Sequence, residues 1–255
     1  MDEHVWDVPT GLYLISRKLN DWNDEELQAR SIAAQDSLKS VSARLSHAAH
    51  HHDEVNASWL RFDERASNKK TATSKLFRVQ GEPLDSHEWF GEAGTITRSA
   101  HLVACVQALH SIPDTLAYAV YFCFELKTPA RERDISVKSV KRELASNAHA
   151  QFACEALASL TDGGRYGHID ALSNHAKHRS IVEDSVRGNP NAGKDAPISL
   201  RFNAFTYETT GNIPVSYVAI DALPLLQSEL SRMQSIVNRF GIALNAYLST
   251  LPNRS

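Results

Sequence analysis

The amino-acid sequence predicts a mainly α protein, a four- or five-helix antiparallel bundle with a small β-hairpin insertion. Two long segments repeat apolar residues in alternating steps of three and four, a pattern typical of helices that pack along a seam. Shorter apolar segments of helical period lie between them, and one stretch near residue 200 alternates apolar and polar residues as strands do. The 255 residues, 42% of them hydrophobic, are expected to form a single domain over residues 1–255.

The first long helix is predicted from Leu27, after Asn23 and Glu26, which resemble a capping box. Its seam residues are Ser31, Ala34, Leu38, Val41, Leu45, Ala48, His52, Val55 and Trp59. Small residues in this seam let a neighbouring helix approach closely, while His52 stands where an apolar group is expected. The polar residues that follow predict a connector over 61–93, with room for a short strand at 76–79.

Four helical segments are predicted in the middle of the chain. Those over 96–112 and 114–126 are separated by Pro113, which either kinks one helix or starts a second one, because it lacks an N–H donor and clashes with the preceding turn. A third segment covers 136–160 and a fourth covers 166–186. Together they predict the hydrophobic centre of the bundle.

The alternating stretch predicts a β-hairpin insertion over residues 198–220. Apolar residues occupy every second position from Ile198, a turn is expected at 209–212, and the alternation resumes from Ile213. Pro214 confines its strand to an edge of the sheet, because proline cannot donate a hydrogen bond to a neighbour.

The most regular seam belongs to the C-terminal helix, predicted from Asp221. Its seam residues are Leu223, Leu226, Leu230, Met233, Val237, Phe240, Leu244, Tyr247 and Leu251. At about 1.5 Å per residue this helix is roughly 43 Å long, so it requires a long partner. We therefore expect the first and last long helices to lie alongside each other.

Composition narrows the classes of function. The formal net charge of −3 argues against a dedicated duplex-binding protein, which needs a basic surface. The N-terminus does not resemble a secretory signal, and the longest apolar run, 116–124, is too short to span a membrane. A cytoplasmic protein without membrane partners is expected. Cys105, Cys123 and Cys154 lie in apolar stretches and fit reduced thiols that pack in the core.

Twelve histidines raise the question of a metal site. His47 and His51 are spaced i,i+4, and His175 and His178 are spaced i,i+3, so each pair could chelate zinc or iron if a third ligand came from elsewhere. The chain contains no H-E-x-x-H, E-x-x-H or C-x-x-C motif. We therefore expect mainly solvated histidines and no cofactor, and keep a histidine-ligated, metal-dependent hydrolase as an alternative.

The strongest candidate site lies in the segment 168–182. Asn174 and His178 share one side of this predicted helix, with Lys177 and Arg179 flanking them. We expect the two to face a crevice between the long helices, where the imidazole acts as a general base, the amide holds a substrate group, and the cations attract phosphate or carboxylate. The alternative is a structural polar pair that joins this helix to a neighbour.

The spacing Asn-x-x-Lys-His at Asn174, Lys177 and His178, late in a mainly helical chain, resembles bacterial helical-bundle proteins of the HEPN (higher eukaryote and prokaryote nucleotide-binding) type. The resemblance covers residues 96–248 and lies mainly in the arrangement of the predicted helices along the chain. Active members of that family carry Arg-x4-6-His on a bundle helix and cut RNA without a metal ion, usually as dimers with facing sites. The resemblance thus implies a homodimer that binds or cleaves RNA, in the manner of a toxin or defence component.

Three pairs in this chain fit the family motif. They are Arg142 with His149, and Arg44 with either His50 or His51. On a continuous helix, seven positions make almost two turns, so Arg142 and His149 would share one face. If the resemblance extends to activity, His149 or His178 takes the proton of a ribose 2′-hydroxyl, and Arg142 or Arg179 steadies the charge that develops on the phosphate.

A basic cluster precedes and enters the third middle segment, where it could contact RNA phosphates. It consists of Lys127, Arg131, Arg133, Lys138, Lys141 and Arg142. A second function from a different class remains open: a non-catalytic helical module whose long seams serve dimerisation or binding of a protein partner.

Overall fold

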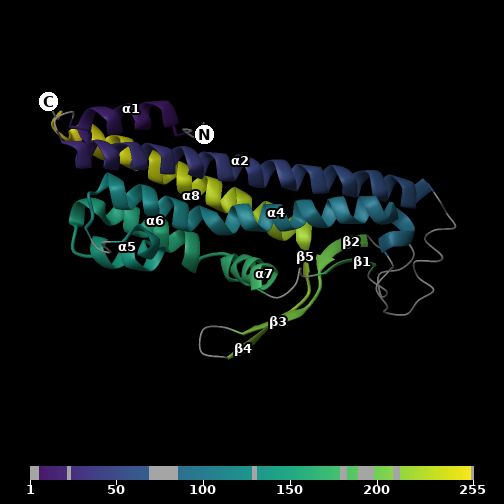
Figure 1. Cartoon of the computed structure of the whole chain (residues 1–255). Coiled ribbons are helices and arrows are strands. Elements are labelled where there is room, and N and C mark those ends of the chain that lie inside the picture. The colour runs from purple at the N-terminus through teal and green to yellow at the C-terminus, as the bar shows by residue number, and fades with distance from the viewer. Residues whose placement is uncertain are drawn as a thin grey trace. The chain divides into compact units, whose positions relative to one another are not determined.

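The computed structural model describes residues 6–21, 24–68, 86–127, 131–178, 183–188, 198–208 and 213–253. Within these residues the protein is mainly helical with a few short antiparallel strands (Figure 1), which confirms the predicted fold class. The α-helices are α1 (Val8–Lys18), α2 (Glu25–Asn68), α4 (Ser86–Cys123), α5 (Val137–Leu144), α6 (Gln151–Asp162), α7 (Tyr166–His178) and α8 (Ala222–Thr250). The strands are β1 (Asp184–Gly188), β2 (Ile198–Phe202), β3 (Phe205–Glu208), β4 (Pro214–Tyr217) and β5 (Ile220–Asp221).

The chain divides into two compact units. Unit 1 comprises Met1–Ser46, Leu109–Gly167 and Leu230–Ser255, and unit 2 comprises His47–Ala108 and His168–Glu229. The three longest helices, α2, α4 and α8, each contribute residues to both units. Among the described helices, none combines the length and the apolar character needed to cross a membrane.

The core of unit 1 is built from the seams that the sequence predicts. Buried seam residues are Ser31, Ala34, Leu38 and Val41 of α2 and Leu230, Met233, Val237, Phe240 and Leu244 of α8. An aromatic group completes this core, in which the rings of Phe124 and Tyr247 stack with their centroids 5.0 Å apart. One-sided burial of this kind is what a 3-4 repeat produces, because positions at that spacing fall on one side of a helix.

The helix α1 was not predicted from the sequence. Asp7 caps its first turn by accepting a hydrogen bond from the backbone N–H of Thr10. Trp6 packs against Gly241 of α8, where a Cβ atom would overlap the indole, and its backbone N–H donates to the side chain of Asn238. A glycine in α8 thus creates the space that holds the residue preceding α1.

The long helix α4 runs through Pro113, so the segments predicted over 96–112 and 114–126 form one helix. It ends in a left-handed turn, since Glu125 has a φ of 51° and the Leu126 N–H donates to the Tyr121 carbonyl over 3.0 Å.

Three other predicted segments differ from the observed elements. The segment 136–160 is divided into α5, a 3₁₀ turn over Ala148–Ala150, and α6. The segment 166–186 ends its helix at His178, and β1 follows. Of the predicted connector, residues 61–68 continue α2 and residues 86–93 begin α4, while the strand considered at 76–79 lies outside the described residues.

The strands of unit 2 form one interrupted hairpin with an added strand. β2 pairs with β1 on one side and β5 on the other, and β3 pairs with β4. Phe202 is opposite Ile220 and Phe205 is opposite Tyr217, so the two strand pairs share a single register. The paired strands therefore confirm a hairpin between residues 198–208 and 213–220, while the turn expected at 209–212 lies outside the described residues. β1, of which residues 184–186 were expected to be helical, pairs with β2 and completes a three-stranded sheet.

The core of unit 2 includes buried polar groups beside the apolar ones. His52 is only 6% exposed, and its Nδ1 lies 3.3 Å from Asp53 Oδ1. Arg98 of α4 is fully covered and forms an ion pair with Asp184 of β1 over 2.6 Å. This ion pair attaches the sheet to α4.

Candidate functional site

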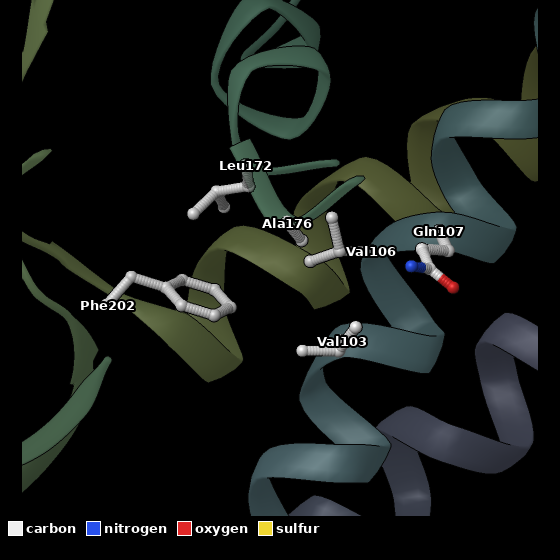
Figure 2. Close-up of a pocket in the computed structure, with 6 residues that line it drawn as sticks. All are labelled: Val103, Val106, Gln107, Leu172, Ala176 and Phe202. Atoms are coloured by element: carbon white, nitrogen blue, oxygen red, sulfur yellow. The ribbon is translucent and has the colours of Figure 1, made fainter. Parts of the chain in front are cut away.

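The helix α7 has an apolar face that packs within unit 2. Figure 2 shows Leu172 and Ala176 of α7 opposite Val103 and Val106 of α4, with the ring of Phe202 from β2 at the side. These residues and Gln107 line a small apolar pocket of about 10 Å³, which is room for about one water molecule. Small-molecule sites usually enclose about 300–1,000 Å³ and carry several converging polar groups. The chemistry of α7 therefore has to come from residues outside this pocket.

Next to this apolar face, two imidazoles of α7 meet a stacked pair of aromatic rings. The His168 ring lies 5.9 Å from that of Phe205 and 5.1 Å from that of Tyr217, centroid to centroid, and the His175 ring lies 5.3 Å from that of Phe205. Phe205 and Tyr217 stack at 5.1 Å with an interplanar angle of 9°. Since seven residues separate the two histidines, they recur on one face of the helix after about two turns.

A carboxylate and an amide lie one turn apart on the same helix. The Asn174 Nδ2 donates a hydrogen bond to Asp170 Oδ1 over 2.9 Å, and both side chains are half-buried. Burial, the Asp170 charge and neighbouring Tyr207 raise the pKa of Tyr217. The Tyr217 phenol is therefore a neutral hydrogen-bond donor at physiological pH. We call this group the α7 site; its members are His168, Asp170, Asn174 and His175 of α7, Phe205 of β3 and Tyr217 of β4.

The predicted residues of the segment 168–182 are only partly described. Asn174 belongs to the α7 site, and Lys177 is exposed on the same helix. His178 is the last residue of α7, but its side chain and Arg179 lie outside the described residues. The proposed crevice between the long helices therefore stays a prediction, whereas the contact of Asn174 with Asp170 is a local one within the helix.

Arg142 and His149 do not share one continuous helix. α5 ends at Leu144, and Asn147 accepts a hydrogen bond from the His149 N–H over 3.1 Å, which caps the 3₁₀ turn that follows. Both side chains are exposed. The expectation that seven helical positions place them on one face was wrong, because the helix is interrupted between them.

Several members of the α7 site were missed in the sequence. His168 and His175 have the spacing of one helix face, and this signal was available before the structure was known. Phe205 and Tyr217 carried no such signal. They lie 12 residues apart in the sequence and come together only because β3 pairs with β4 in the observed register.

The first histidine cluster lies elsewhere in unit 2, where His51 of α2 contacts His101 of α4. Over the residues whose positions are described, no group of three or more His, Cys, Asp or Glu side chains is arranged to hold a metal ion.

Fold and site together define a mainly helical protein of two units, with an imidazole and aromatic site on one helix of the second unit. Comparison of the chain with models of protein families, with curated proteins and with solved structures finds no match.

Proposed function

We propose that this protein binds single-stranded RNA at the α7 site and cleaves it by imidazole acid–base catalysis without a metal ion. The observation that supports this proposal is the meeting of His168 and His175 with the stacked rings of Phe205 and Tyr217. These side chains suit both parts of such a reaction, because bases stack on aromatic rings and imidazoles exchange protons near neutral pH.

Binding uses three kinds of group. An unpaired base stacks against the outer face of the aromatic pair, an interaction that tolerates any base because every base has a π-face. The Asn174 amide and the neutral Tyr217 phenol supply hydrogen bonds to base or ribose. Lys177, exposed on the same helix, attracts the phosphate backbone. Single-stranded RNA suits these groups because its bases are free to leave the helical stack.

Cleavage uses the two histidines at the end of α7. His178, the last residue of the helix, follows His175 by three positions, which is about one turn. His178 takes the proton of the ribose 2′-hydroxyl as its oxygen attacks phosphorus. The bond from phosphorus to the 5′-oxygen breaks, and protonated His175 gives its proton to that oxygen. The products are a 2′,3′-cyclic phosphate and a 5′-hydroxyl end.

The test is cleavage of labelled single-stranded RNA in the presence of EDTA. We expect the wild type to form cyclic phosphate ends, and His175→Ala and His178→Ala each to slow cleavage by about 10²–10⁴-fold, the usual contribution of a general acid or base. Phe205→Leu should weaken binding by about 5- to 150-fold, because stacking is worth about 1–3 kcal/mol per base. The rate at saturating RNA should stay closer to that of the wild type.

Two further sets of variants make the test specific. Lys177→Ala should weaken RNA binding, because it removes a cation that attracts the phosphate backbone. Lys39→Ala, which removes an exposed lysine on α2, is its control. Arg142→Ala and His149→Ala test the family motif. If these variants lose cleavage while the α7 variants keep it, the catalytic residues are those of the motif and not those of α7. A wild type that neither binds nor cuts RNA would contradict the proposal altogether.

A second candidate function is an interaction module for a protein partner. Ile213 and Val218, which flank β4, are 64% and 77% exposed. Exposed apolar residues contribute to sites of protein association when they join into a larger patch. If RNA is not a ligand, Val218→Lys should weaken self-association or capture of a partner in size-exclusion chromatography, whereas His175→Ala should not.

A further inference from the structure

Four histidines gather at the contact between α2 and α4 in unit 2. The Nδ1 atoms of His51 on α2 and His101 on α4 lie 2.9 Å apart. The His50 ring lies 5.2 Å from that of His51 and 6.2 Å from that of His101, centroid to centroid. His47, one helical turn before His51, also bears on its titration.

The short distance between the two Nδ1 atoms limits how many protons these two atoms can carry together. A hydrogen bond between two imidazoles requires that one Nδ1 carries a proton and the other accepts it. With one proton added, a charged ring can still donate to a neutral one. With both rings charged, both Nδ1 atoms carry hydrogen and both rings are positive, so the contact between His51 and His101 cannot persist.

The groups around the pair mostly act against its protonation. Burial is the largest cause that lowers the pKa of His51, followed by the charges of His101, His50 and His47, while Glu54 acts in the opposite direction. On α4, the group that faces His51 is His101. On α2, the groups whose charges act on the His51 ring are His47, His50 and Glu54, and the neighbouring His52 and Asp53 side chains contact each other.

The pair lies beside an apolar contact between the same two helices. Cys105 of α4 donates its thiol hydrogen to the Ala48 carbonyl of α2 at a distance of 3.3 Å. Leu102, which follows His101, and Val55, which is four residues after His51, are buried, and so is His52. Loss of the imidazole contact would therefore open the edge of a packed helix pair to water.

We infer that the His51–His101 pair, together with His50 and His47, is a pH-sensitive contact that joins α2 to α4 when neutral and releases them when both rings are protonated. This device is independent of the proposed action on RNA. Because the pKa of His51 is lowered below the ordinary value of about 6.5, the contact contributes its full stability above that pH. Its contribution is lost as the pH falls through the lowered pKa.

The test is amide hydrogen exchange of the full chain between pH 7.5 and pH 5.0, with rates normalised to those of an unstructured peptide. In the wild type, protection of the amides over residues 47–61 and 94–108 should fall as the pH drops below the lowered pKa. Each proton that the released helices take up should make this fall about tenfold per pH unit. In His51→Gln and His101→Gln, which keep amide donors but do not titrate, the fall should be less than about threefold.

The variant His149→Gln is the control, since it removes an exposed imidazole of unit 1 and should behave as the wild type. NMR titration of the histidine rings checks that both glutamine variants remain folded at pH 7.5. Equal pH dependence in the wild type and the glutamine variants would overturn the inference. Stoichiometric zinc binding at pH 7.5 that depends on His51 and His101 would also overturn it, because the cluster would then be a metal site.

Discussion

Arg98 and Asp184 form an ion pair in the interior of unit 2, between α4 and β1. The guanidinium donates from Nε and Nη2 to the same carboxylate oxygen, over 3.0 Å and 2.6 Å. The exposed fractions of the two side chains are 0% and 7%. Ser99 donates to the other oxygen of the carboxylate. The sheet is therefore attached to the helical part of unit 2 through charges that are almost completely covered.

Removal of one partner should destabilise the protein strongly. A buried charge left without its partner typically costs about 3–5 kcal/mol, so Asp184→Ala should lower the free energy of unfolding by that amount. Denaturant unfolding measures the loss. Lys39→Ala is the matched control, because Lys39 and Asp36 form an exposed pair at 3.2 Å whose loss should cost no more than about 1 kcal/mol. A loss below about 1 kcal/mol for Asp184→Ala would show that water reaches the pair.

Gly241→Ala tests the contact between α8 and the residue preceding α1. A Cβ atom at Gly241 would overlap the Trp6 indole, so this variant should lose about 1–3 kcal/mol of stability, as overpacked sites do. Gly167→Ala is the control, since its Cβ would meet no atom within 4 Å and alanine favours the helix by up to about 1 kcal/mol. Thermal unfolding compares the two. The double variant Gly241→Ala, Trp6→Leu should recover part of the loss, and no recovery would place the strain elsewhere.

The three cysteines should differ in reactivity. Burial raises the pKa of the Cys105 and Cys123 thiols to about 12, so little thiolate forms at neutral pH. Cys154 is only partly buried. In the native protein at pH 7.5, iodoacetamide should modify Cys154 before the other two, as measured by peptide mass spectrometry. In denaturant all three should react at similar rates, and early labelling of Cys105 in the native state would contradict its buried environment.

Glu125→Gly should stabilise the end of α4. Glu125 has a φ of 51°, a conformation that costs a residue with a Cβ atom about 1 kcal/mol and costs glycine little. The gain is expected to approach 1 kcal/mol in the free energy of unfolding. Glu125→Ala keeps the Cβ atom and separates this effect from the loss of the carboxylate. If alanine matches or exceeds glycine in stability, the backbone turn is not strained.

Some parts of the α7 site could be predicted from the sequence and others could not. The face of α7 that carries His168 and His175 follows from helical spacing, which is a local property, and so does the i,i+4 pairing of Asn174 with Asp170. The partner rings of Phe205 and Tyr217 depend on the register of the hairpin, and the contact of His51 with His101 joins residues 50 positions apart. No local pattern encodes such pairs, because they depend on which segments pack together.

The amino-acid sequence by itself determined the long helices and the hairpin of this protein. Their apolar residues recur at the period of the element, and burial of one side stabilises an element that presents such a side. Tertiary structure alone decided the break between Arg142 and His149, the change from helix to strand after His178, and the contacts of the histidines. At these places the free energy of packing between distant segments exceeds the weak local preference of the backbone, which spans less than about 1 kcal/mol for most residues.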